Sequence, residues 1–157
     1  MISLANDCDF HMKIEGDQQS IKTFLSLLHV SDTELNNGSV IEIGENFYRT
    51  YEAWIYFSDK TTLWIEGYCA WSVQTCLIDE HFDTNINLVT VSQDLNLQIT
   101  IKSREIGLCF SEHYLIKNGE IIVDQCEAYD YFYFYDEEGE FIEEEREIEF
   151  EALLNID

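Results

Sequence analysis

Alternation of apolar and polar residues appears early in the chain, and it is typical of a β-strand with one buried face. Residues 8–16 (CDFHMKIEG) alternate in this way and end at Gly16, a residue type common in turns. Phe10, Met12 and Ile14 would share one face of such a strand. We therefore expect a strand here, with these three side chains in the core.

The apolar spacing changes to a helical period immediately afterwards. Asp17 is a good N-cap residue, because its carboxylate can accept a hydrogen bond from a free backbone N–H group of the first helical turn. The apolar residues that repeat at helical spacing are Ile21, Phe24, Leu25 and Leu28. This pattern predicts an amphipathic helix that packs on a sheet.

The middle of the chain is rich in candidate strands. Residues 31–40 are polar and predict a loop, whereas residues 40–71 contain several aromatic-rich stretches typical of strands. The polar triplet at residues 58–60 interrupts these stretches and predicts a hairpin.

Two less regular segments follow. Residues 72–84 have no pattern that we can assign to an element. Residues 85–96 favour a short helix with Thr84 as its cap, although their valines and threonine also suit a strand.

The clearest strand signals lie in the second half. Residues 97–102 alternate, and residues 106–116 form a second candidate strand. Asn118–Gly119 is a strong hairpin signal, because these residue types tolerate the positive φ angles of a two-residue turn. Residues 120–125 would be the returning strand, and residues 131–135 (YFYFY) alternate Tyr with Phe, which favours a strand with a wet tyrosine face.

Together these elements predict one α+β domain over residues 1–157, an antiparallel sheet with two helices on one face. The chain has no proline, and we find no low-complexity linker or internal repeat. An apolar fraction of 46% and an aromatic fraction of 14% are those of a folded chain, because acidic disordered chains are poor in aromatic residues. At 157 residues the chain is long enough to bury a core.

The charge is far from balanced. The chain carries 32 acidic residues against 8 Lys and Arg, a formal net charge of −24. Residues 1–78 hold 11 acids and 4 bases, whereas residues 79–157 hold 21 acids and 4 bases. A surface this negative disfavours binding to nucleic acids and to anionic membranes, and it attracts cationic partners.

The acid is densest in residues 126–151, where Arg146 is the only basic residue. We favour a strand to about residue 150 and a short helical or frayed end after it, although a helix stays open, because Glu, Arg, Ala and Leu are all good helix formers. In a strand, Ile148 and Phe150 would anchor one face, while alternate glutamates would form a row on the other, roughly 6.7 Å apart. That interval is near the spacing of charge along a nucleic acid strand.

The sequence contains no enzyme signature that we can find, and we expect neither a catalytic residue, a cofactor nor a specific metal site. The segment at residues 136–140 (DEEGE) lacks the ligand spacing of an EF-hand loop. The four histidines show no paired metal-ligand spacing. Residues 111–113 (SEH) are neighbours in a predicted strand, so their side chains point to opposite faces and cannot form a triad alone. We interpret them as sheet residues at a rim.

The five cysteines are widely spaced and form no CxxC motif. We find no signal peptide and no apolar run of membrane-spanning length. These features favour reduced, buried thiols and a cytoplasmic protein.

Three stretches in order resemble the YubB-type ferredoxin-like family of plasmid and phage proteins. They are residues 5–16 (ANDCDFHMKIEG), 63–72 (LWIEGYCAWS) and 95–122 (LNLQITIKSREIGLCFSEHYLIKNGEII), within a span of about residues 5–125. Val73 and Gln74 stand where the family usually has two prolines. The resemblance implies a ferredoxin-like core over residues 1–125, followed by an acidic, β-rich extension over residues 126–157. It also implies a mobile-element origin, often beside genes that counter host defence, and transfers no catalytic residue.

Our main hypothesis is a non-enzymatic inhibitor that occupies the basic nucleic-acid groove of a host defence complex, either a CRISPR effector or a restriction enzyme. Tyrosines beside the carboxylates would supply desolvated anchors. The predicted partner-binding residues are Asp136, Glu137, Glu138, Glu143, Glu145, Glu147 and Glu149, with Tyr131, Tyr133 and Tyr135.

Two alternatives stay open. The chain could be an immunity protein or antitoxin that neutralises a basic toxin such as a nuclease. It could also be an enzyme for a small cationic substrate, which would need a deep pocket and a perturbed carboxylate.

Overall fold

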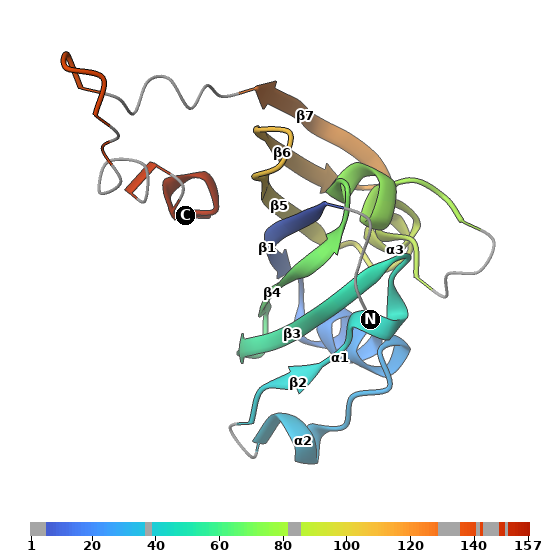
Figure 1. The fold of residues 1–157 in the computed structure, drawn as a ribbon. Helices are drawn as coiled ribbons and strands as arrows, with labels where there is room; N and C mark the ends of the chain where they lie inside the picture. Colours follow the sequence, from blue (N-terminus) through green and yellow to red (C-terminus); the bar gives the residue numbers. More distant parts are fainter. Residues whose placement is uncertain are drawn as a thin grey trace.

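The computed structural model describes residues 6–36, 39–81, 86–128, 136–140, 142, 148–149 and 151–157. These residues form an α+β fold built on one seven-stranded antiparallel sheet with the strand order β2-β3-β4-β1-β5-β6-β7 (Figure 1). None of the helices in the described part of the chain is long and apolar enough to cross a membrane.

Strand β1 (Asp7–Glu15) lies near the centre of the sheet, between β4 and β5. Its alternation is the one expected, since Phe10, Met12 and Ile14 are at most 1% exposed. Helix α1 (Gln18–Leu27) follows and buries Ile21 on the same core. The strand, the helix and their shared core are therefore confirmed.

Strands β2 (Ile41–Glu42), β3 (Thr50–Ser58) and β4 (Thr62–Ala70) form the first half of the sheet, with the 3-10 helix η1 (Gly44–Asn46) between β2 and β3. The predicted hairpin joins β3 to β4, and the Asp59 carboxylate accepts a hydrogen bond from the Thr61 backbone N–H at 2.9 Å. Gly67 of β4 is required by close packing, because a Cβ there would collide with the backbone of Glu52 and Ala53.

The segment that we could not assign contains a π-helix, η2 (Gln74–Ile78). Helix α3 (Leu88–Asp94) confirms the predicted short helix, but the cap differs: the Asn87 side chain accepts a hydrogen bond from the Thr90 backbone N–H at 2.9 Å. The predicted cap, Thr84, lies outside the described residues.

The last three strands are β5 (Gln98–Glu105), β6 (Phe110–Lys117) and β7 (Glu120–Ala128). Residues 106–109, predicted as the start of a strand, instead form the turn between β5 and β6. The Asn118–Gly119 hairpin is confirmed, with φ angles of 54° and 76° that fit a tight two-residue turn.

The two faces of the sheet are covered differently. Helices α1 and α3 lie on one face, as predicted, and Figure 1 shows the C-terminal segment on the opposite side. On that outer face Leu154 is only 4% exposed, and the Lys13 ammonium group donates a hydrogen bond to the Asp157 backbone oxygen at 3.1 Å.

Two predicted segments need correction. Residues 31–40 were expected to be loop, but Asp32–Asn36 form helix α2, whose start is capped by Ser31 through a hydrogen bond from the Glu34 N–H at 3.3 Å. A strand was expected to about residue 150, but residues 148–149 and 151–153 are helical. Ile148 is 63% exposed, so it is not an anchor, and Phe150 lies outside the described residues.

Candidate partner-binding surface

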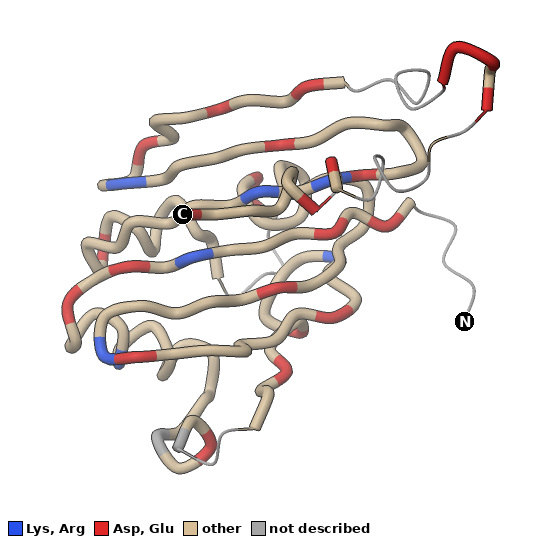
Figure 2. Tube along the Cα trace, turned by 90° about the vertical axis from the view of Figure 1, so that its left-hand side faces the viewer, with Lys and Arg blue, Asp and Glu red and all other residues tan. Residues whose placement is uncertain are grey.

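Exposed carboxylates follow the last strand and the turn beyond it. We call this set the acidic rim; it comprises Glu120, Asp124 and Glu127 on β7 and Asp136, Glu137, Glu138 and Glu140 on the turn, all exposed. Figure 2 shows these red segments along the outermost strand and on the projecting turn. The sequence has no Lys or Arg between Lys117 and Arg146, so no basic side chain of that stretch neutralises the rim.

Backbone hydrogen bonds fix the shape of the turn. The Asp136 carboxylate accepts hydrogen bonds from the N–H groups of Glu138 at 2.9 Å and Glu140 at 2.8 Å. The Glu140 oxygen accepts a hydrogen bond from the Asp136 N–H at 2.8 Å, and Gly139 adopts a φ of 81°, which favours glycine. Three predicted binding residues, Asp136, Glu137 and Glu138, therefore lie together on an ordered, exposed turn.

The remaining predicted residues are not brought together in this way. Glu149 is exposed in the helical C-terminal segment, away from the turn (Figure 1). The other predicted residues, Glu143, Glu145, Glu147, Tyr131, Tyr133 and Tyr135, lie outside the described residues. The carboxylate row and its tyrosine anchors stay predictions.

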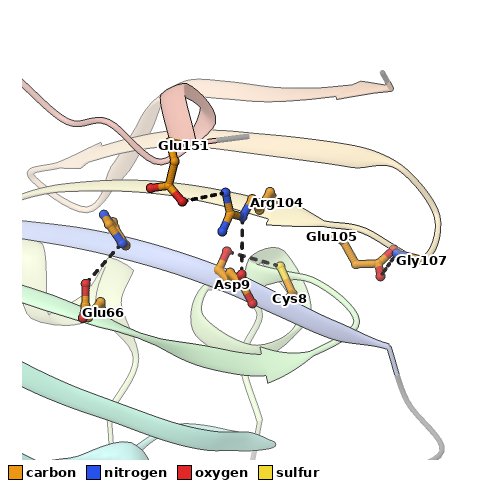
Figure 3. A network of polar contacts seen from close by, with 8 residues as sticks. Cys8, Asp9, Glu66, Arg104, Glu105, Gly107 and Glu151 are labelled. Carbon is orange, nitrogen blue, oxygen red and sulfur yellow. Dashed lines mark hydrogen bonds and ion pairs between the residues drawn. The ribbon is translucent and has the colours of Figure 1, made fainter. Parts of the chain in front are cut away.

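A network of charged side chains lies on the outer sheet face, beneath the C-terminal segment (Figure 3). Arg104 of β5 reaches the Asp9 carboxylate at 3.3 Å and the Glu151 carboxylate at 3.8 Å. Beside it, Glu66 of β4 pairs with His11 at 3.2 Å and accepts a hydrogen bond from the Trp54 indole N–H at 3.1 Å. The network thus links β1, β4 and β5 to the C-terminal segment.

A small cleft of about 150 Å³ opens within this network. Burial is the main cause that raises the pKa of Asp9, and the charge of Arg104 acts against it. The carboxylates of Asp9, Glu66 and Glu151 each have a basic partner. The arrangement is therefore more typical of ion pairs that hold elements together than of an acid–base site.

Three buried thiols, those of Cys8, Cys69 and Cys76, gather beside the inner sheet face. The hydrogen bond between Cys69 and Cys76 raises the pKa of Cys69 and lowers that of Cys76. Within the described ranges, no group of three or more His, Cys, Asp or Glu side chains could hold a metal ion. All five cysteines are free, but Cys109 is only partly buried and Cys126 is exposed, so the expectation of buried thiols holds for three of them.

Sequence reasoning missed two features of the last two strands, β6 and β7. It predicted a strand at residues 120–125 but expected further strands after it, so it did not predict that β7 would be the edge strand of the described sheet. It also placed Glu112 at a rim, whereas this residue is 4% exposed. The parity that Glu112 shares with Tyr114 and Ile116 was a signal for its burial.

A comparison of the chain with protein-family models, with curated proteins and with solved structures found no match in any of the three.

Proposed function

We propose that this protein is a non-enzymatic acidic inhibitor that binds a basic, nucleic-acid-binding protein complex and occupies its nucleic-acid groove. One observation carries the proposal: the acidic rim presents seven exposed carboxylates, three on β7 and four on the turn at residues 136–140. A basic groove that binds a polyanion gains free energy by releasing counterions, and a fixed row of carboxylates can produce the same effect.

The rim suits this role because part of it is preorganised. The Asp136 turn is held by three backbone and side-chain hydrogen bonds between 2.8 and 2.9 Å, so its backbone and the Asp136 carboxylate lose little conformational freedom on binding. The strand β7 fixes the other three carboxylates along an extended backbone. A preorganised anion has a lower entropic cost of binding than a flexible tail of the same charge.

The proposed biological setting is the cytoplasm of a host cell, with a CRISPR effector or a restriction enzyme as target and a phage or mobile element as source. The arrangement of the core is in line with the ferredoxin-like fold that we propose for residues 1–125. β3, β4, β1 and β5 are adjacent in that order, α1 follows β1, and α3 precedes β5. The fold itself does not determine the function.

The proposal is tested by neutralising the turn without changing its shape. The variant with Asp136→Asn, Glu137→Gln and Glu138→Gln keeps the Oδ1 acceptor at position 136. The matched control, with Glu34→Gln, Glu45→Gln and Glu52→Gln, removes three exposed carboxylates from the first half of the chain and therefore has the same net charge.

Binding is measured to purified CRISPR effector and restriction complexes, in competition with DNA, from 50 to 500 mM NaCl. We expect wild type and control to compete with DNA and to lose affinity steeply with salt. We expect the turn variant to bind about tenfold more weakly at low salt, with a smaller difference at high salt. Equal affinities of the turn variant and the control, or a flat salt response, would contradict the proposal.

A further inference from the structure

The two edges of the sheet are protected to very different degrees. At the first edge, β2 and the segment before η1 cover β3: the Ile43 N–H donates to the Ala53 oxygen at 2.7 Å, and the Ala53 N–H donates to the Glu42 carboxylate at 3.0 Å. At the second edge, β7 forms eight residue pairs with β6, and none of the described residues pairs with its outer side. An open strand edge presents alternate N–H and C=O groups to any extended segment.

Of the devices that usually protect an edge strand, β7 has charged side chains and a bulge near its start, but it has neither proline nor lysine and it is not short. Such strands commonly carry proline, lysine or a central bulge, or they are very short. The sequence of β7, EIIVDQCEA, has neither proline nor lysine, and its register shift lies near its start, opposite Leu115 and Ile116. Ile121 and Ile122 are 39% and 55% exposed, so an added strand would also find apolar surface to cover.

Charge decides which segment fits this edge. Glu120, Asp124 and Glu127 give β7 three carboxylates and no basic side chain. A second copy paired antiparallel about the strand centre would set Asp124 opposite Asp124 and would join two chains of charge −24. A segment rich in Lys and Arg would instead meet opposite charges on both faces, because Asp124 and Glu127 have opposite parity.

We propose that β7 is a docking strand, to which the basic partner adds an extended cationic segment as an eighth strand of the sheet. The inference rests on the proposed function and specifies how the partner is held: backbone hydrogen bonds fix the register, and the carboxylates of β7 select a cationic sequence. The Asp136 turn follows β7 in the sequence and would supply further carboxylates to the same basic partner.

The first experiment uses peptides as probes, so it does not depend on identifying the partner. A nine-residue peptide of alternating Lys and Val is compared with its Glu and Val counterpart, and with a Lys and Val peptide N-methylated at every residue, so that both of its edges are blocked. The methylated peptide has the same charge, but it has no N–H donor and the methyl groups on both edges prevent it from pairing with β7. Amide hydrogen exchange of residues 120–128 is the readout.

We expect the Lys and Val peptide to slow exchange of the outward-facing amides of β7 at least about tenfold, because they become hydrogen-bonded. The methylated peptide and the Glu and Val peptide should have no such effect. Equal protection by the methylated peptide, or protection limited to residues 136–140, would overturn strand addition. A dimer that pairs through the outer edge of β7 would show that a second copy of the chain, and not a cationic segment, occupies this edge.

The second experiment uses the full chain and separates this inference from the proposed function. In an antiparallel strand the N–H groups of neighbouring residues point to opposite edges, so Asp124→Pro and Gln125→Pro remove donors on different sides of β7. Thermal unfolding identifies the variant that keeps the β6–β7 ladder. That variant should bind the peptide and the partner complex at least about tenfold more weakly than wild type.

If the stable proline variant still binds the partner complex as wild type does, while the turn variant does not, the docking strand is wrong and the proposed function stands. If neither the proline variant nor the turn variant weakens binding, the docking strand and the proposed function are both wrong.

Discussion

At the residue scale, the buried carboxylate of Glu112 in β6 accepts several hydrogen bonds. Its oxygens accept hydrogen bonds from the backbone N–H groups of Val73 at 2.8 Å and Gln74 at 3.1 Å, at the start of η2. Hydroxyl groups of Ser103 and Tyr114 donate to it at 2.8 and 2.9 Å. Burial, followed by the charge of Glu112, raises the pKa of Tyr114, so the phenol stays a donor. One carboxylate thus ties η2 to β5 and β6.

This arrangement predicts a large cost for Glu112→Gln. The substitution replaces an acceptor oxygen with an amide group that donates, so at least one buried N–H or O–H group loses its partner. We expect the free energy of unfolding to fall by about 2–4 kcal/mol, the cost of a buried, charge-assisted contact. Urea unfolding at pH 7 measures it.

The matched control is Glu127→Gln, on the exposed part of β7, which we expect to change the free energy of unfolding by less than about 0.5 kcal/mol. Similar values for the two variants would mean that the carboxylate of Glu112 is not the link described above.

At the element scale, helices α1 and α3 begin with the same geometry but different chemistry. The Asp17 carboxylate accepts a hydrogen bond from the Ser20 N–H at 2.7 Å, and the Asn87 amide oxygen accepts one from the Thr90 N–H at 2.9 Å. The backbone hydrogen bond from Ser20 is the main cause that lowers the pKa of Asp17. Only the cap of α1 therefore depends on a titrating group.

This difference predicts that the cost of an alanine substitution depends on pH at Asp17 but not at Asn87. Because the pKa of Asp17 is lower in the folded state, its carboxylate contributes stability above pH 3.8, the ordinary pKa of an aspartate. This stability is lost as the pH falls through the pKa that Asp17 has in the folded state. The cost of Asp17→Ala should therefore shrink below pH 3.8, whereas the cost of Asn87→Ala should stay near about 1 kcal/mol. Urea unfolding of both variants and wild type between pH 7 and 3 tests this; parallel curves would contradict it.

Local signals explain which elements could be predicted from the sequence. β1, α1 and the Asn118–Gly119 hairpin depend on alternation, a cap and a turn pair that are readable within a few residues. The short helix α2 also had a local signal, Ser31 three residues before Glu34, which outweighs the polar composition that favoured a loop.

Contacts between distant segments explain what could not be predicted. Nothing near Leu154 in the sequence shows that it packs on the outer sheet face, or that Glu151 reaches Arg104 in β5. Without these contacts, Ile148 is the more apolar candidate for an anchor, yet it is exposed. The negative charge of the candidate surface could be predicted from the sequence at Asp136, Glu137 and Glu138. The outer edge of β7 could not be predicted in this way, because it depends on the strand order of the whole sheet.

At the scale of the whole molecule, repulsion among carboxylates opposes folding. The chain has 32 acidic residues and 8 Lys and Arg, and the ion pairs among the described residues gather on β1, β4, β5 and the C-terminal segment. The acidic rim lies beyond that cluster. Compaction brings like charges closer, so a net charge this far from zero lowers the stability of the folded state.

Salt should therefore stabilise this protein, although salt weakens ion pairs. The Debye length falls from roughly 30 Å at 0.01 M to roughly 3 Å at 1 M, which removes long-range repulsion first. We expect the urea midpoint and the thermal midpoint to rise between 0.02 and 0.5 M NaCl; each gain of about 1 kcal/mol raises the thermal midpoint by roughly 3 °C. The neutralised turn variant should gain less than wild type, because three of the repelling charges are gone. A wild type that salt destabilises would instead show that pairs such as Arg104 with Asp9 and Glu151 outweigh the repulsion of the acidic rim.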